Sequence, residues 1–175
     1  MPRYAIPVTD IAPPARLAKL PEELVSSSTF LLKRLGFAAR ERAIEAYGRI
    51  GLHPYHHAVL ALLDEGSRET QGAIADALGY DRGQLVGLLD ELEQRGLIER
   101  RRDPADRRRH TVHLTPSGKG TLAKLRSLAS GLEDDFLAPL DDTQREQLHA
   151  ILLRLAGRHV RPCAPPPPAG DAAST

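Results

Sequence analysis

Apolar residues recur at spacings of three and four along most of the chain, which is the pattern of amphipathic helices. The first predicted helix runs from Glu22 to Gly48, and the second begins at Pro54 and ends at Gly66, with the buried run Ala58–Leu63 between. Further helices are predicted after residues that can cap a helix start, namely Thr70, Asp81, Thr115 and Asp141. The pattern therefore predicts a mainly helical protein.

The period changes from helical to alternating between Leu97 and Thr115. Leu97–Arg101 and His110–Thr115 are predicted to pair as strands, and the Asp and Pro residues between them favour a turn. Before them, two short helices are separated by Gly79, as in a helix-turn-helix. The predicted fold class is mainly α (α+β), a winged helix-turn-helix with a two-stranded wing flanked by long N- and C-terminal helices.

The flanking helices carry more apolar surface than a small module of this size needs, so we expect them to form a homodimer. Both ends of the chain are rich in proline and are expected to be irregular tails. The predicted organisation is a flexible tail over 1–15, a dimerisation helix over 16–51, a DNA-binding lobe over 52–115, dimerisation helices over 116–160 and a disordered tail over 161–175.

Positive charge is concentrated around the predicted wing. The segment Arg95–Arg109 holds seven arginines against three acidic residues, a net charge of +4, whereas the whole chain carries +1. A basic cluster on one exposed element of a nearly neutral protein is the pattern expected for contacts with nucleic-acid phosphates. Because aromatic residues make up 4% of the chain and Trp is absent, base stacking on single strands is disfavoured, and groove binding to duplex DNA fits better.

Several other classes of protein are disfavoured. No apolar run approaches the roughly 18 residues of a membrane span, and the N-terminus lacks the apolar core of a signal peptide, so we expect a cytoplasmic protein without membrane partners. No nucleophile motif, phosphate-binding glycine loop or pair of catalytic acids is present, so we expect neither an enzyme nor a cofactor. A winged helix serving only as a protein interaction module is the alternative function, but it would not need the wing arginines.

The amino-acid sequence of the wing and its flanking residues resembles that of the MarR family of bacterial transcription regulators. The resemblance rests on Gly96-Leu97-Ile98 at the helix end, on Asp106 and Arg108 in the wing, and on Leu114-Thr115 with Gly118, and it covers about residues 22–158. It implies a dimer of winged-helix subunits that represses nearby genes. It also implies release from DNA when a small ligand, often phenolic or aromatic, binds between the dimerisation helices and the DNA-binding lobe.

The candidate DNA contacts lie on the helix after Asp81 and in the wing. The side of that helix opposite its leucines would enter the major groove of a pseudo-palindromic operator; Gln84 could read adenine, Arg82 could contact guanine or phosphate, and glycines allow close approach. In the wing, arginines could reach phosphates or a narrow minor groove, with Arg108 deepest and Asp106 orienting it. The full candidate set is Arg82, Gly83, Gln84, Val86, Gly87, Arg107, Arg108 and Arg109.

A cluster of histidines and tyrosines near the second helix is the candidate effector site. Adjacent His56 and His57 point about 100° apart on a helix, which disfavours a shared metal ion, so no metal site is predicted. The resemblance favours use as polar lining of the ligand pocket, in competition with helix capping and interface hydrogen bonds. The candidates are Tyr47, His53, Tyr55, His56 and His57. The single cysteine, Cys163, lies in the predicted tail and not near the first helix, where relatives place a peroxide-sensing thiol.

Overall fold

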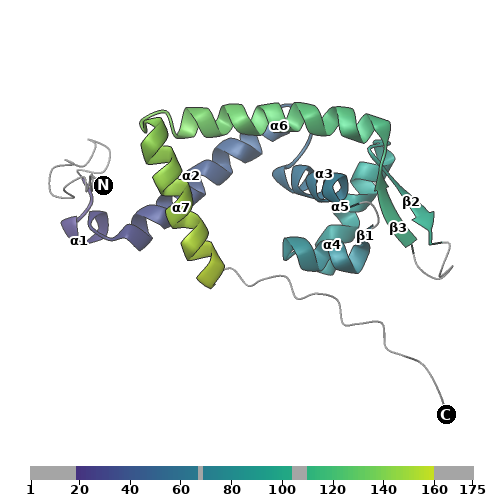
Figure 1. Ribbon diagram of the computed structural model, residues 1–175, viewed down its shortest axis with the longest axis horizontal. Helices are drawn as coiled ribbons and strands as arrows, with labels where there is room; N and C mark the ends of the chain where they lie inside the picture. The colour runs from purple at the N-terminus through teal and green to yellow at the C-terminus, as the bar shows by residue number, and fades with distance from the viewer. Residues whose placement is uncertain (1–18, 67–68, 104–109, 160–175) are drawn as a thin grey trace, which may run out of the picture. The chain divides into compact units, whose positions relative to one another are not determined.

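The computed structural model describes residues 19–66, 69–103 and 110–159, which are helical over most of their length (Figure 1). The chain divides into two compact units, residues 1–42 and residues 43–175. The predicted tails, the tip of the wing with Asp106, Arg107, Arg108 and Arg109, and Cys163 lie outside the described residues.

The first predicted helix is interrupted near its start, so the expectation of one continuous helix was wrong. Helix α1 spans Glu22–Val25 and α2 spans Ser28–Gly48. Between them, the Ser26 hydroxyl donates to the carbonyl of Glu22 at 2.7 Å, and the Ser27 hydroxyl accepts the amide of Phe30 at 3.3 Å. Serine side chains that bond to nearby backbone groups compete with the helical ladder, which explains the break at this pair.

Helix α3 begins at the predicted Pro54, and the next two helices of the lobe begin after the predicted cap residues. Helix α3 spans Pro54–Glu65, α4 spans Gln71–Leu78 after the Thr70 cap, and α5 spans Arg82–Gln94 after the Asp81 cap. Gly79 adopts a φ of 66° between α4 and α5, a conformation that favours glycine, which confirms the predicted turn.

The wing is confirmed as an antiparallel pair, β2 (Ile98–Arg102) with β3 (His110–Leu114), in the register Ile98 to Leu114 and Arg102 to His110. A short strand that the sequence pattern did not predict, β1 (Glu69–Thr70), pairs with the other edge of β3, so the sheet order is β1-β3-β2. Two residues are too few for an alternating pattern, and only the fold brings them beside β3.

Two helices follow the wing. Helix α6 spans Pro116–Phe136, with the Thr115 hydroxyl accepting the amide of Gly118 at 3.0 Å, and α7 spans Asp142–His159. Asp141 and Gln144 accept each other's backbone amides at 2.9 and 3.1 Å, which confirms the predicted capping box. Among the helices in the described part of the chain, none is long and apolar enough to span a membrane.

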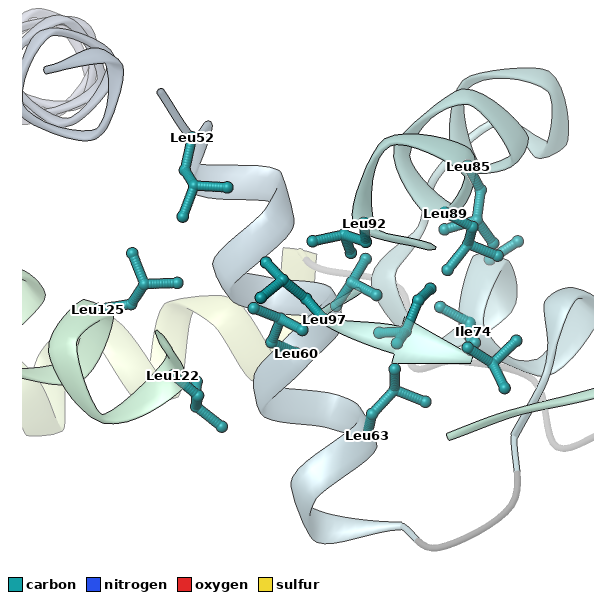
Figure 2. Close-up of a cluster of buried hydrophobic side chains, with 14 of the residues drawn as sticks. Leu52, Leu60, Leu63, Ile74, Leu85, Leu89, Leu92, Leu97, Leu122 and Leu125 are labelled. Atoms are coloured by element: carbon teal, nitrogen blue, oxygen red, sulfur yellow. The ribbon is translucent and has the colours of Figure 1, made fainter. Parts of the chain in front are cut away.

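The hydrophobic core of the second unit is built mainly from leucines of α3, α5 and α6 (Figure 2). Leu60 of α3, Leu89 of α5 and Leu125 of α6 are fully buried, and Ile74 of α4 and Val112 of β3 complete the cluster. This core holds α5 by its leucine face, which leaves the opposite face of α5 at the surface.

Candidate nucleic-acid interface and ligand cavity

Helix α5 presents an exposed face on the side opposite its core leucines, and we refer to α5 as the recognition helix. Its first two turns expose all five predicted contact residues, while Leu85 between them is buried; the exposed residues are Arg82, Gly83, Gln84, Val86 and Gly87. This face is polar apart from Val86, and it holds two positions without a side chain. It therefore has the shape and chemistry of a helix that can approach base edges.

The start of the recognition helix is fixed by its cap. One oxygen of Asp81, Oδ1, accepts the amides of Gly83 at 2.9 Å and Gln84 at 3.2 Å. A Cβ added at Gly83 would lie 3.1 Å from the same oxygen, whereas a Cβ at Gly87 would meet nothing within 4 Å of its own chain. The space beside Gly87 is consequently available to a partner.

Two acidic residues near the end of the recognition helix, Asp90 and Glu93, form ion pairs with an arginine of the wing. The guanidinium of Arg100, on β2, donates to Asp90 at 2.6 Å and also to Glu93, and its side chain is only 19% exposed. Burial acts to lower the pKa of Arg100, but the bonds and charges of Asp90 and Glu93 outweigh it and raise that pKa. Arg100 is therefore placed as an anchor between wing and helix, a role that sequence reasoning missed because it depends on a contact between two elements.

The neighbouring arginines of β2 face outward. Arg101 pairs with Glu99 at the surface, and Arg102 is exposed at the end of the strand. The exposed side of the wing that leads toward residues 104–109 is thus basic.

A shallow cavity of about 300 Å³, open to solvent, lies between the C-terminal end of α2, from Ala43 on, and helices α3 and α6 within the second unit. Its wall is mostly apolar and is formed by Ala43, Tyr47, Pro54, His57, Ala58, Ala61, Ala129 and Leu132. An apolar cavity with few polar groups is the usual form of a small-molecule site.

The polar part of this wall is a hydrogen-bonded pair. Tyr47 Oη lies 2.6 Å from His57 Nδ1, and the two rings stack with centroids 5.8 Å apart. Burial raises the pKa of Tyr47 and, together with the nearby charge of Arg126, lowers the pKa of His57, so both groups are neutral near pH 7. A neutral pair can donate a hydrogen bond to a ligand or accept one from it. Which of these it does depends on the tautomer of His57, and therefore on whether Tyr47 Oη or His57 Nδ1 donates the bond between them.

The other residues of the predicted effector cluster do not line the cavity. His53 Nδ1 accepts the amide of Tyr55 at 3.2 Å and His56 Nδ1 accepts the amide of His53 at 3.1 Å, so both histidines cap α3. The Tyr55 ring packs against Tyr80, with centroids 4.9 Å apart. Among the described residues, no group of three His, Cys, Asp or Glu side chains could hold a metal ion.

The arrangement of an exposed helix face beside a basic hairpin defines a winged helix-turn-helix DNA-binding protein. A sequence model of the MarR family matches residues 50–109. A regulatory protein of Thauera aromatica assigned to the hcr operon is 33% identical over 141 residues, which cover 76% of this chain and 84% of that protein.

Solved structures agree with this grouping. The transcriptional repressor CouR bound to a 23-mer DNA duplex is 36% identical, with a TM-score of 0.70 over 77% of this chain and 96% of that chain. CouR from Rhodococcus jostii RHA1 bound to p-coumaroyl-CoA is 30% identical, with a TM-score of 0.66 over 78% of this chain and 96% of that chain. The chain belongs to the MarR family of transcription regulators, which are DNA-binding proteins and not enzymes.

Proposed function

We propose that this regulator is a homodimeric repressor that binds a pseudo-palindromic operator and leaves it when a small aromatic ligand occupies the cavity. The observation that carries the proposal is the exposed face of the recognition helix, which lies opposite the buried Leu85 and Leu89 and next to the basic wing. The exposed position of Gln84 and Arg82 suits them to read bases or phosphates in the major groove, and Gly87 lets the helix come close.

The wing supplies the second set of contacts in this proposal. Arg107, Arg108 and Arg109 follow the exposed basic end of β2 in sequence and would reach phosphates or the minor groove. CouR, a relative of this chain, has been solved on a DNA duplex, which supports the same mode of binding here.

Dimer formation is supported by apolar side chains that the single chain leaves at its surface. On α2 these include Leu35 and Phe37, and on α7 they include Ile151 and Leu153, each more than half exposed. Such apolar surface is unusual for a monomer and typical of an assembly interface.

The ligand proposal is supported by the cavity and its polar pair. The apolar wall suits an aromatic ring, and the pair of Tyr47 and His57 can hydrogen-bond a phenol or carbonyl group. CouR from Rhodococcus jostii RHA1 has been solved with p-coumaroyl-CoA, whose acyl group has this chemistry. We therefore propose an aromatic acid or its thioester as the effector.

Fluorescence anisotropy of the purified protein on the intergenic DNA upstream of its own gene tests the DNA proposal. Binding should exceed that to a scrambled duplex and weaken steeply between low and physiological salt, because phosphate contacts release counterions. Equal, feeble and salt-insensitive binding to both duplexes would favour the protein interaction module.

Two substitutions separate base readout from phosphate contact. Gln84→Ala should relax the preference at one base position in each half-site, at a cost of about 1–3 kcal/mol on the preferred sequence. Arg108→Ala should weaken binding to every duplex and reduce the salt slope by about one. Retained preference in the first variant, or an unchanged slope in the second, would remove that residue from the interface.

The effector proposal is tested by adding p-coumaroyl-CoA, p-coumarate or coenzyme A alone to the protein–DNA complex. Release by the first or second and not by the third would identify the aromatic group as the effector. His57→Phe should keep the cavity wall apolar and remove the polar partner, so the ligand concentration for release should rise about tenfold, the cost of one hydrogen bond. An unchanged concentration would exclude the pair of Tyr47 and His57 from ligand recognition.

A further inference from the structure

The first turn of α3 touches the cavity on one side and the recognition helix on the other. Pro54 and His57 line the cavity, whereas Tyr55 and His56, between them in sequence, contact groups on or beside α5. These four residues share one turn of backbone, and close-packed protein interiors transmit strain, so a displacement at the cavity side is passed to the side that faces α5.

The contact through His56 has a defined proton arrangement. The backbone amide of His53 can only donate, so His56 Nδ1 must be the unprotonated acceptor, and the neutral ring carries its proton on Nε2. That atom is buried and lies 3.1 Å from Glu91 Oε2 of the recognition helix, at an angle away from the ideal hydrogen-bond direction. The Glu91 side chain is 59% exposed, so it has room to rotate beside His56 Nε2.

A second contact reaches the start of the same helix. The ring of Tyr55 packs on Tyr80, which directly precedes Asp81, the cap of α5. The first turn of α3 therefore contacts the recognition helix at two places, near its start through Tyr80 and in its third turn through Glu91. Two contacts along a helix are enough to fix the direction of its axis.

We propose that His56 is a positioning residue that couples occupancy of the cavity to the orientation of the recognition helix through Glu91. The proposal rests on the proposed function, because it treats the cavity as the effector site. A ligand beside Pro54 and His57 displaces the first turn of α3, the contact between His56 Nε2 and Glu91 Oε2 is lost, and α5 leaves the orientation that fits the major groove.

The test needs neither the effector nor the operator. Ala129, on α6, lines the same cavity as Pro54 and His57 of α3. Ala129→Leu would place a larger side chain in the cavity, where it acts as a covalently attached occupant. Hydrogen exchange of the α5 amides is then measured in the full-length protein with and without this substitution. We expect Ala129→Leu to raise exchange in α5 by about threefold or more through local opening.

Glu91 supplies the variants that decide between coupling and simple support. In a Glu91→Ala background, Ala129→Leu should no longer change the exchange of α5, because the link is already lost. In a Glu91→Gln background the amide oxygen still accepts from His56 Nε2, so the response should remain. Both variants change an exposed side chain and leave the core intact.

An equal response in the Glu91→Ala background, or no response to Ala129→Leu at all, would overturn the proposal. Leu132→Phe fills the cavity from the same helix and gives the same test should Ala129→Leu fail to fold. The operator assay on the same proteins keeps the two proposals apart: coupling in the exchange data with no DNA binding by any variant would support the role of His56 and reject the repressor function.

Discussion

Three histidines within residues 53–57 occupy three different environments. His53 caps α3, His56 closes the capping box and is buried against Glu91, and His57 stands in the cavity wall with Tyr47. The sequence grouped them as one cluster, but the helix turns each ring in its own direction. The three histidines therefore have different roles: His53 caps a helix, His56 contacts the recognition helix, and His57 lines the cavity.

We predict that stability falls as the pH is lowered below 6.5, and that His56 causes part of the fall. Burial lowers the pKa of His56 below its ordinary value of 6.5, with Arg95 and His53 acting the same way and Glu91 acting against them. Between the folded-state pKa and 6.5 the unfolded chain binds more protons, so the free energy of unfolding rises with pH across that window. Urea denaturation from pH 5 to pH 8 measures the slope.

His56→Asn should reduce this slope, because asparagine keeps an acceptor for the His53 amide and does not titrate. His57 contributes in the same direction, since burial and Arg126 lower its pKa, so the slope should shrink and not vanish. A variant at His56 with the wild-type slope would contradict the assignment.

Two glycines of α6 lie two residues apart and should respond in opposite ways to alanine. A Cβ at Gly118 would overlap the carbonyl oxygen of Leu97 and approach a methyl of Leu114, whereas one at Gly120 would meet nothing within 4 Å. Gly118→Ala should lower the free energy of unfolding by about 1–3 kcal/mol or more through overpacking, and Gly120→Ala should raise it by about 1 kcal/mol. Chemical denaturation of the two variants checks both signs, and equal effects would rule out the close approach as the reason for Gly118.

The element that joins the wing to the lobe is β2, and its anchor is Arg100. The side chain lies between Asp90 and Glu93 of the recognition helix, so it neutralises two acids that would otherwise repel phosphates. The wing and the recognition helix are thereby held as one DNA-binding surface.

Arg100→Gln should lower the free energy of unfolding by about 1–3 kcal/mol, because the charged hydrogen bonds of a side chain that is only 19% exposed are lost. It should also weaken operator binding, although in our proposal Arg100 does not touch DNA. Arg101→Gln, on the exposed side of the same strand, should change stability by about 0.5 kcal/mol or less. Urea denaturation and anisotropy on both variants test the contrast, and similar stability losses would argue against an anchoring role for Arg100.

At the scale of the whole molecule, the described chain leaves apolar side chains uncovered on α2 and α7. We predict a dimer in sedimentation velocity at micromolar concentration. Leu153→Glu, at a position 59% exposed in the single chain, should shift the protein toward monomer, while Gln147→Glu adds the same charge to a polar position of α7 and should not. A wild-type monomer would overturn the proposed architecture.

Much of the fold was predictable from local signals. The caps Thr70, Asp81 and Thr115, the turn at Gly79 and the alternating strands of the wing each depend on a few neighbouring residues, and the structure confirms them. The break at Ser26 and Ser27 was missed because apolar spacing continued across it. In α4, Ala75 is buried and Ala77 is exposed, because the packing direction of an eight-residue helix depends on its neighbours.

The candidate site divides in the same way. The sequence by itself determined the winged helix-turn-helix, the exposed face of the recognition helix and the basic character of the wing, because helical and strand periods and charge are properties of short segments. Only the tertiary structure decided that Tyr47 meets His57, that His56 faces Glu91 and that Arg100 joins β2 to α5. Each of these contacts joins residues on different elements, and their meeting depends on how the leucine core packs those elements together.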